Sequence, residues 1–319
     1  MTQKFDFQFT ADASALGKRL DQVLAEACRE VSRSRLQEWI AKGWISVDGA
    51  VINKQRHKLS GGEFISIEAE IEQAGEWLPE NIPLHIVHED DELIVVNKSP
   101  DMVVHPAPGN LNGTLVNALL HHASELKLLP RAGIIHRLDK DTSGLLVVAK
   151  TLNAHSHLVA QLQDRAFERE YQCLCHGQMI AGGTVEQAIG RHPQNRILMA
   201  VTPMGKEAIT HYRIKQKFND FTELQVNLET GRTHQIRVHM AHLRYPIVGD
   251  QLYGRANYVP SGCSDRLKLQ LRAFKRQALH ARKLGLVHPS TGDMLSWEVE
   301  PPQDYQQLLQ TVEQENGQV

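Results

Sequence analysis

Cysteine is scarce in this sequence, and its spacing is irregular. The 319 residues contain only Cys28, Cys173, Cys175 and Cys263, which do not form the pattern of a disulfide-stabilised domain. One residue separates Cys173 from Cys175, whereas the cysteines of a structural zinc pair are usually separated by two or more. We therefore expect no disulfide framework and no metal, and a reducing cytoplasm fits this composition.

Long hydrophobic runs are also absent. No apolar run approaches the roughly 20 residues that cross a bilayer. Residues Met1–Thr10 alternate polar residues with phenylalanine and lack the apolar core of a signal peptide. The sequence predicts a cytoplasmic protein that is neither exported nor bound to a membrane.

Motifs that hold nucleoside triphosphates are missing. The sequence contains no glycine-rich phosphate loop, no Walker motif and no Asp-Phe-Gly triplet. His136-Arg137-Leu138-Asp139 is similar to a kinase catalytic loop, but in kinases the aspartate follows the arginine directly. Phosphoryl transfer is therefore disfavoured.

The net charge of −2 hides an uneven distribution. Residues 17–60 contain nine Lys and Arg against five Asp and Glu, and residues 61–92 contain ten acids and no base. Residues 93–319 contain 25 bases against 20 acids. Two mildly basic segments flank an acidic one, which permits a polyanionic partner such as nucleic acid.

The first basic segment has the pattern of a small αβ domain. Residues 19–28 and 33–42 have the apolar spacing of two amphipathic helices. Residues 44–51 contain an Asp-Gly hairpin turn, and residues 61–67 predict a closing strand. This order resembles the S4 domain, a small RNA-binding module.

An acidic segment follows this small domain. Residues 68–83 contain glycine and proline and predict a linker rather than a helix or strand. We therefore expect two domains, an S4-like RNA-binding domain at residues 17–77 and a larger catalytic domain at residues 84–306.

The polar residues at 136–144 are concentrated in one predicted turn. The following run, Leu145–Ala149, has the length and β-branched content of a buried strand, which would hold the turn rigidly. Asp139 lies in this turn between Arg137 and Lys140. A carboxylate with such neighbours is usually part of a solvated loop with weak ion pairs, and the alternative is a reaction centre.

Three motifs together favour the reaction centre, because they resemble the RluA family of pseudouridine synthases. Residues 136–145 match the family pattern H-R-L-D-x-x-[ST]-[ST]-G-L, whose aspartate, here Asp139, is catalytic. Arg169-Glu170-Tyr171 and the Thr-Gly-Arg-Thr-His-Gln-Ile-Arg-Val-His of residues 230–239 follow in family order. The resemblance implies an isomerase that converts specific uridines of large-subunit (23S) ribosomal RNA, clustered in a stem-loop, to pseudouridine without a metal or redox cofactor.

The expected fold class is α+β. A mixed, mainly antiparallel sheet with flanking helices would form the catalytic domain, preceded by the small S4-like αβ domain. The sequence pattern predicts strands at 93–98, 167–175, 223–229 and 279–284, and helices at 114–120, 151–165, 233–243 and, polar and fraying, at 303–319.

The resemblance also implies catalytic roles. Asp139 would be the nucleophile, and the guanidinium of Arg237 would favour its charged form. Tyr171 would stack on the extruded base and present its hydroxyl for proton transfer at C5. A structural salt bridge and a core tyrosine are the non-catalytic alternatives. The residues leave open whether Asp139 adds to C6 of the base or attacks C1′ of the sugar.

Further residues are expected to contact the substrate. Arg137 would help to fill the position that the flipped uridine leaves, and Ile236 would close the other face of the base. The other predicted substrate-binding residues are His105, Thr142, Gly144, Arg33 and Arg35.

The expected partner is large-subunit ribosomal RNA or a pre-ribosomal particle, bound by a monomer. Two other classes compete with this interpretation. One is an RNA-binding ribosome-assembly factor with an inactive synthase fold. The other is an aspartate-dependent hydrolase of a small substrate, which would not require a basic N-terminal segment.

Overall fold

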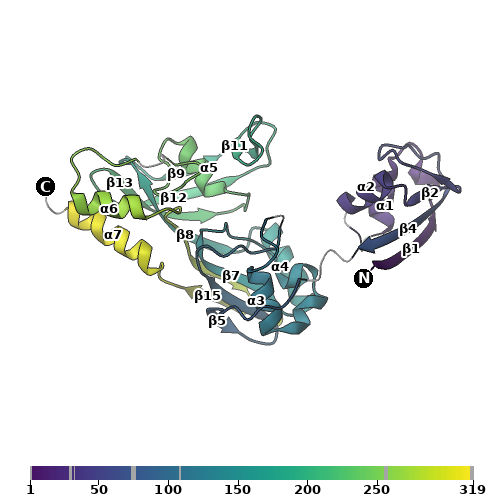
Figure 1. Cartoon of the computed structure of the whole chain (residues 1–319), viewed down its shortest axis with the longest axis horizontal. Coiled ribbons are helices and arrows are strands. Elements are labelled where there is room, and N and C mark those ends of the chain that lie inside the picture. The colour runs from purple at the N-terminus through teal and green to yellow at the C-terminus, as the bar shows by residue number, and fades with distance from the viewer. Residues whose placement is uncertain are drawn as a thin grey trace. The chain divides into compact units, whose positions relative to one another are not determined.

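The computed structural model describes residues 2–28, 31, 33–72, 77–107, 109–254 and 258–316. The chain divides into two compact units, Met1–Glu76 and Trp77–Val319 (Figure 1). None of the helices in the described ranges combines the length and the apolar character that a membrane crossing needs.

The N-terminal unit is a four-stranded antiparallel sheet with two helices. The strand order is β1-β4-β2-β3. The two residues between β2 and β3, Asp48 and Gly49, have φ values of 49° and 79°, as a two-residue hairpin turn requires. The elements are β1 (Thr2–Thr10), α1 (Leu20–Ala27), α2 (Arg33–Ala41), β2 (Ile45–Val47), β3 (Ala50–Val51) and β4 (Phe64–Glu72).

The predicted linker at residues 68–83 is wrong in its first part. Glu68 pairs with Asp6, and Glu72 pairs with Thr2, so β4 continues through this segment against β1. Ala69 between the acids is buried, which shows the alternation of a half-buried strand. The high acid content concealed this two-residue period.

The second unit is built on one large sheet. Its strand order is β5-β6-β7-β14-β8-β13-β12-β9, with β15 paired to β14. The β7–β14 pair is parallel and the other pairs of this sheet are antiparallel, which confirms the predicted mixed sheet. The strands are β5 (Ile86–Glu89), β6 (Leu93–Lys98), β7 (Ser143–Ala149), β8 (Glu168–His176), β9 (Gly183–Glu186), β12 (Ile209–Lys217), β13 (Phe221–Leu228), β14 (Leu279–Val287) and β15 (Met294–Glu298).

Helices and one small hairpin complete this unit. The predicted caps Thr114 and Thr151 start α3 and α4, and each side chain accepts a hydrogen bond from the first turn. The helices are α3 (Leu115–His122), α4 (Leu152–Gln163), α5 (Gln235–His242), α6 (Asp265–Ala273) and α7 (Gln303–Asn316), and the hairpin consists of β10 (Ile189–Arg191) and β11 (Met199–Val201).

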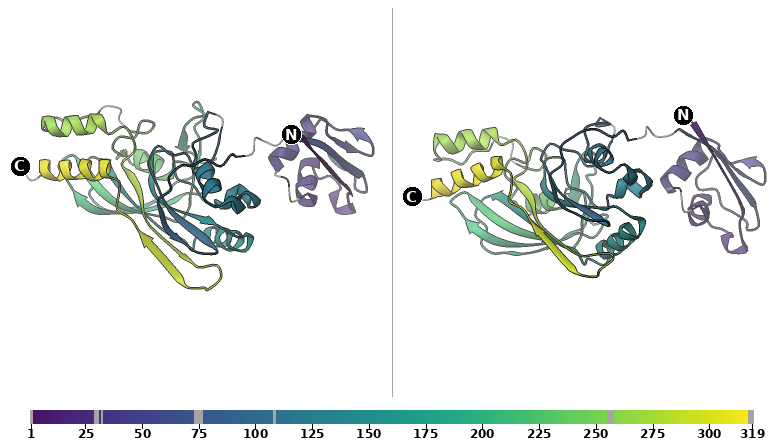
Figure 2. Two further views of the ribbon diagram at one scale, coloured as in Figure 1. Left: turned by 60° about the horizontal axis from the view of Figure 1, so that its bottom comes forward. Right: turned by 90° about the horizontal axis from the view of Figure 1, so that it is seen from below.

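The C-terminal helix differs from its prediction as a fraying polar helix. Tyr305 and Leu308 of α7 are fully buried, and Val312 is 1% exposed. Figure 2 shows α7 beside α6, and the carboxylate of Glu315 accepts from the hydroxyl of Ser264 at 2.6 Å. A three- and four-residue apolar spacing within a glutamine-rich segment was enough to bury one face of the helix.

Strand β7 is the central element for the site. All seven of its residues are buried, because they separate two apolar clusters on the two faces of the sheet. A strand buried on both faces has one stable register, so the turn that precedes it, residues 136–142, is held in one position.

Candidate active site

Asp139 lies in the turn that leads into β7. Its carbonyl oxygen accepts from the backbone nitrogen of Thr142 at 3.1 Å. The hydroxyl of Thr142 in turn accepts from Nε2 of Gln277 at 3.0 Å. Gly144 has a φ of 114°, and a Cβ there would collide with the carbonyl of Ala281 on β14. The absence of this side chain allows β7 and β14 to approach, which fixes the turn.

A buried lysine supports the same turn. Nζ of Lys98 donates to the carbonyl oxygens of Ser99, Met102 and Lys140 at 2.8, 3.0 and 2.9 Å. Burial lowers the pKa of Lys98 to about 7, although the nearby Asp141 and Asp139 oppose that shift. Three acceptors match the three N–H groups of an ammonium, so Lys98 ties the residue after Asp139 to the end of β6.

Arg237 joins two carboxylates. Its Nη1 donates to Oδ2 of Asp139 at 3.0 Å. Its Nε and Nη2 donate to the two oxygens of Asp250 at 2.7 and 2.9 Å. Arg237 therefore makes its two-point contact with Asp250, and Asp139 receives a single hydrogen bond. This arrangement leaves Oδ1 of Asp139 free of the guanidinium.

Asp250 and Tyr253 orient the guanidinium. Asp250 is buried and also accepts from the backbone nitrogens of Leu252 and Tyr253 at 2.9 and 3.0 Å. The ring of Tyr253 lies 5.1 Å from the Arg237 guanidinium carbon, and its hydroxyl is 2.8 Å from Nδ1 of His234. The other ring nitrogen of His234 lies 3.9 Å from Oδ1 of Asp139.

The charges of this cluster stabilise one another. Burial alone would lower the pKa of Arg237, but the hydrogen bonds and charges of Asp250 and then Asp139 raise it well above its usual value. Burial favours a higher pKa for Asp250, and the opposing hydrogen bond and charge of Arg237 outweigh it and lower the pKa. Burial lowers the pKa of His234 despite the nearby Asp139 carboxylate. At neutral pH, Arg237 is charged and His234 is a neutral ring.

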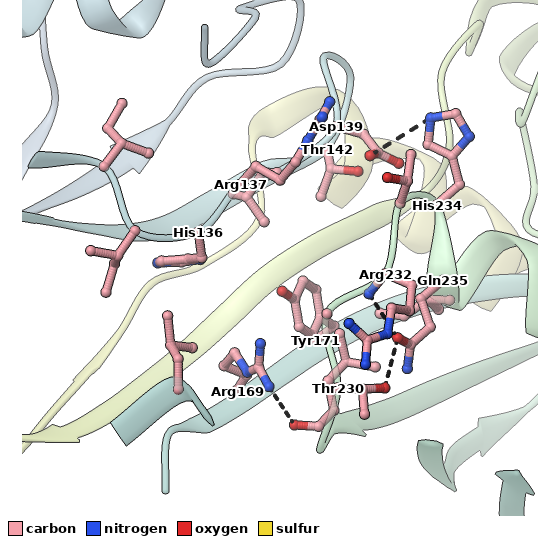
Figure 3. Close-up of a pocket in the computed structure, with 18 of the residues that line it drawn as sticks. His136, Arg137, Asp139, Thr142, Arg169, Tyr171, Thr230, Arg232, His234 and Gln235 are labelled. Atoms are coloured by element: carbon pink, nitrogen blue, oxygen red, sulfur yellow. Dashed lines mark hydrogen bonds and ion pairs between the residues drawn. The ribbon is translucent and has the colours of Figure 1, made fainter. Parts of the chain in front are cut away.

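Asp139, His234 and Arg237 line a pocket of about 910 Å³ in the second unit (Figure 3). Its lining includes Asp139, Tyr171, Ile236 and Arg237, so the structure brings the three predicted catalytic residues and Ile236 together. In Figure 3, His234 lies beside Asp139, with Tyr171 and then Arg169 on the opposite side of the pocket. The volume is at the upper end of the roughly 300–1,000 Å³ typical of ligand pockets.

Tyr171 comes from the middle of the sheet. It lies on β8, paired with Val226 of β13 on one side and Ala281 of β14 on the other, and is 7% exposed. Burial raises the pKa of Tyr171, the charge of Arg169 opposes the shift, and Asp139 adds to it. The pocket therefore presents a neutral phenol across from the carboxylate.

The other predicted substrate-binding residues are placed as follows. His105, Arg137 and Thr142 line the pocket, whereas Gly144 is not among its lining residues. In the N-terminal unit, Nη2 of Arg33 is 2.9 Å from the buried carboxylate of Asp21. The side chain of Arg35 lies outside the described residues.

Sequence reasoning assigned no role to Lys98, Asp250 or Tyr253, and it included His234 only as part of the motif at residues 230–239. Asp250 follows the apolar pair Ile247-Val248 and a glycine, which is the usual position of a polar residue at the end of a buried segment. That signal marks a candidate but does not identify its partner. In the described part of the chain, no group of three His, Cys, Asp or Glu side chains is arranged as metal ligands.

Comparison with known families agrees with the fold and the pocket. The family model described as RNA pseudouridylate synthase matches residues 92–242, which contain Asp139, Tyr171 and Arg237, and the S4 domain model matches residues 18–65. Together with the relatives described next, these matches show that the chain belongs to the RNA pseudouridylate synthase family. It is a pseudouridine synthase with an N-terminal S4 domain.

Several similar curated proteins are named ribosomal large subunit pseudouridine synthase D. The protein of Haemophilus ducreyi is 50% identical over 98% of this chain and 96% of its own length. That of Escherichia coli strain K12 is also 50% identical, with the same coverage of 98% and 96%. That of Pasteurella multocida is 52% identical over 94% of this chain and 92% of its own length.

Two solved structures share the fold. Human RNA pseudouridylate synthase domain containing 4 is 23% identical, with a TM-score of 0.56, over 72% of this chain and 92% of that chain. Human RNA pseudouridylate synthase domain containing 1 is 24% identical, with a TM-score of 0.54, over 70% of this chain and 85% of that chain.

Proposed function

We propose that this synthase converts clustered uridines in a stem-loop of large-subunit ribosomal RNA to pseudouridine, with Asp139 as the nucleophile. The observation that carries the proposal is the single hydrogen bond from Arg237 to Asp139 in a pocket whose opposite side presents Tyr171. The relatives at about 50% identity, named for the large ribosomal subunit, support the choice of RNA.

The reaction is an isomerisation, so it needs no external reagent. The bond between C1′ of ribose and N1 of uracil breaks, a bond between C1′ and C5 forms, and the hydrogen on C5 is replaced while N1 gains one. Asp139 acts from Oδ1, the oxygen that the guanidinium does not contact, either at C6 or at C1′. The pocket holds the detached uracil between the two bond changes.

Tyr171 has two functions in this proposal. Its ring is one face of the base site, opposite Ile236, and both side chains are almost completely buried. Its hydroxyl relays the proton that leaves C5 once the C1′–C5 bond has formed, and a proton is returned to N1, so the isomerisation balances. Because burial raises the pKa of this phenol, the hydroxyl is neutral and gives up its own proton only as it takes the one from C5.

The target uridine must leave its stack before it can enter the pocket. Arg137 is exposed at the pocket next to Asp139, where it can occupy the position from which the base was extruded. Asp139 and Arg237 both come from one chain, so we propose that a monomer carries the complete site.

The N-terminal unit supplies RNA affinity. We propose that the S4-like domain, residues 17–77 as predicted together with β1, binds phosphates through basic residues that include Arg33 and Arg35. The catalytic domain, predicted at residues 84–306, also includes α7 to its end. A ribosomal RNA substrate, free or in a pre-ribosomal particle, places the enzyme in the cytoplasm.

The proposal is tested by incubating the protein with transcripts of large-subunit and small-subunit ribosomal RNA and mapping pseudouridine in each. We expect modification at a few discrete uridines of one large-subunit stem-loop. Tight RNA binding without any pseudouridine would instead indicate an assembly factor with an inactive fold. Turnover of free uridine monophosphate without modification of RNA would indicate a hydrolase.

A further inference from the structure

A part of the pocket lining has no assigned step in the proposed reaction. It contains Trp77, His105 and Arg131, all of which line the pocket and belong to the second unit. A pocket of about 910 Å³ also has room for more than the one extruded nucleotide. This part has aromatic and cationic side chains but no acid of its own.

The aromatic component is a pair of rings. The ring centroids of Trp77 and His105 are 6.1 Å apart with planes inclined at 44°, and Trp77 keeps 37% of its surface exposed. Burial and, to a smaller extent, the charges of Arg131 and Arg137 lower the pKa of His105 to about 4. His105 is therefore a neutral ring at physiological pH, and the pair offers an apolar face to a base.

Trp77 is held in place although it begins the second unit. The carbonyl oxygen of Leu78 accepts from Nδ2 of Asn117 at 2.8 Å. The backbone nitrogen of Glu80 donates to the carbonyl oxygen of Asn117 at 2.9 Å, and its carboxylate accepts from the nitrogen of Gly113 at 3.0 Å. Asn117 also completes the cap of α3, so the segment after Trp77 is attached to a regular element.

The cationic component is presented by a strained turn. Arg131, Ala132 and Gly133 have φ values of 53°, 53° and 77°, three successive residues in the left-handed region. The turn buries Ala132 and leaves Arg131 exposed at the pocket. Such strain persists only where the surrounding structure enforces it, and here it directs a cation toward the ring pair.

Two cations of this region are not neutralised. Among the described residues, the side chains of Arg131 and Arg137 have no hydrogen bond and no ion pair. The charge of Arg137 contributes to lowering the pKa of both His105 and His234, so Arg137 is within electrostatic range of this region and of the Asp139 cluster. A phosphate between Arg131 and Arg137 would join the base on the ring pair to the uridine beside Asp139.

We propose that Trp77, His105 and Arg131 form a second nucleotide subsite that binds a base and phosphate adjacent to the target uridine. This inference rests on the proposed RNA substrate and deepens it. The subsite selects single-stranded RNA, because its neighbour base must also be unstacked to reach the rings. It accounts for a preference for loops without any reading of base edges.

The first test measures contact with Trp77 and does not depend on turnover. A ribosomal RNA stem-loop is titrated into the full-length protein and into W77F, and the difference in tryptophan emission isolates Trp77. We expect this emission to be quenched as RNA binds. The matched control is W297F, because Trp297 also pairs with a histidine, His88 at 5.2 Å, but does not line the pocket. An unquenched Trp77 in the bound state would overturn the subsite.

The second test is a double-mutant cycle with the RNA. RNA variants carry an abasic site either 5′ or 3′ of a modified uridine, and their affinities are measured for the wild-type protein, W77A and W77F. We expect W77A to bind intact RNA about tenfold more weakly than the wild-type protein does, and W77F to retain most of the affinity. For W77A, one of the two abasic RNAs should bind as tightly as intact RNA, because the contact that the missing base would make is already lost. Independent, additive losses for both abasic positions would contradict the proposal.

The third test concerns the phosphate. R131A should lower affinity several-fold and reduce the slope of log Kd against log salt by about 0.7, the value for one contact on single-stranded nucleic acid. R266A serves as the control, because Arg266 is an exposed α6 residue bonded to Gln314 and does not line the pocket. An R131A slope equal to that of the wild-type protein would remove Arg131 from the subsite.

The three tests distinguish a failure of the nucleotide subsite from a failure of the proposed pseudouridine synthesis. Quenching and coupling without any pseudouridine would leave the subsite intact and contradict the proposed reaction. Normal pseudouridine formation by W77A and R131A with unchanged affinities would contradict only the subsite.

Discussion

Arg237 donates two hydrogen bonds to Asp250 but only one to Asp139, from which it is separated by 98 positions in the sequence. The buried Asp250 carboxylate, which also accepts from two backbone nitrogens, therefore fixes the guanidinium, and the guanidinium fixes Asp139. The nucleophile of the proposed reaction is positioned through a residue that does not touch it.

This chain of contacts predicts a large effect of Asp250. Asp250→Asn keeps the shape but removes the charge that holds Arg237, and a misplaced guanidinium should slow single-turnover isomerisation by about 100-fold at saturating RNA. RNA affinity should stay within about threefold, because Asp250 does not line the pocket.

The variant Arg237→Lys should isomerise comparably slowly, since lysine cannot hold Asp250 at two points. Glu298→Gln, which breaks the Arg282–Glu298 pair of β14 and β15, is the control. A normal rate for Asp250→Asn would make that carboxylate purely structural.

Tyr171→Phe separates stacking from proton transfer. The ring and its burial remain, so RNA affinity should change less than about threefold, whereas loss of the hydroxyl should slow the single-turnover rate by about 100-fold. The matched control is Tyr212→Phe, on β12 and outside the pocket lining. Equal rates for Tyr171→Phe and the wild-type protein would limit Tyr171 to stacking.

His280 should make stability dependent on pH. It is fully buried, its Nδ1 is 2.9 Å from the hydroxyl of Ser143, and its Nε2 is 3.1 Å from the carbonyl oxygen of Val299. Burial is the main cause that lowers the pKa of His280 from 6.5 to about 4; the hydrogen bond with Val299 opposes this shift, and the charges of Arg276 and Arg282 favour it. Between these two values the unfolded chain binds more protons than the folded chain, so the contribution to stability is complete above pH 6.5 and falls as the pH drops toward 4.

The variant His280→Gln tests this dependence. Glutamine can keep one donor and one acceptor but does not titrate. Between pH 7 and pH 5 the wild-type protein should lose about 2 kcal/mol more unfolding free energy than the variant. Urea unfolding of the second unit at the two pH values measures both losses. Parallel losses in the two proteins would show that His280 is not a source of acid sensitivity.

Truncation tests whether the N-terminal unit contributes RNA binding while the second unit carries the chemistry. A protein that begins at Trp77 keeps the contacts of Leu78 and Glu80 with α3, so it should fold and modify some uridines. It should bind RNA more weakly, with a smaller salt dependence and poorer discrimination between a ribosomal and a scrambled stem-loop. A protein that begins at Pro83 lacks these contacts and Trp77, and it should bind still more weakly. Equal affinity and salt slope in the full-length and truncated proteins would exclude the N-terminal unit from RNA binding.

Much of the fold could be predicted from the sequence. Local patterns identified most helices and strands, because apolar periodicity and caps such as Thr114 and Thr151 act within one or two turns. The errors arose where composition obscured a period, as in the acidic end of β4 and the glutamine-rich α7. Helix α6, in a segment with no predicted element, is defined by its packing on α7 as much as by its own residues.

The site was predictable in part. Motif order and the family resemblance grouped Asp139, Tyr171 and Arg237, and the pocket contains all three. The sequence could not show that Asp250 accepts two of the three hydrogen bonds that Arg237 donates to carboxylates, or that Lys98 at the end of β6 supports the turn. Those relationships depend on how distant segments pack, and no local pattern encodes the distance between them.

The most direct test of the account is the single-turnover rate of Asp139→Asn at saturating ribosomal stem-loop RNA, measured beside its RNA affinity. Asparagine preserves the size of the side chain and can still accept from Arg237, so affinity should remain within a few-fold while pseudouridine formation becomes undetectable. Isomerisation at a measurable fraction of the wild-type rate, in a preparation free of wild-type enzyme, would show that Asp139 is not the nucleophile.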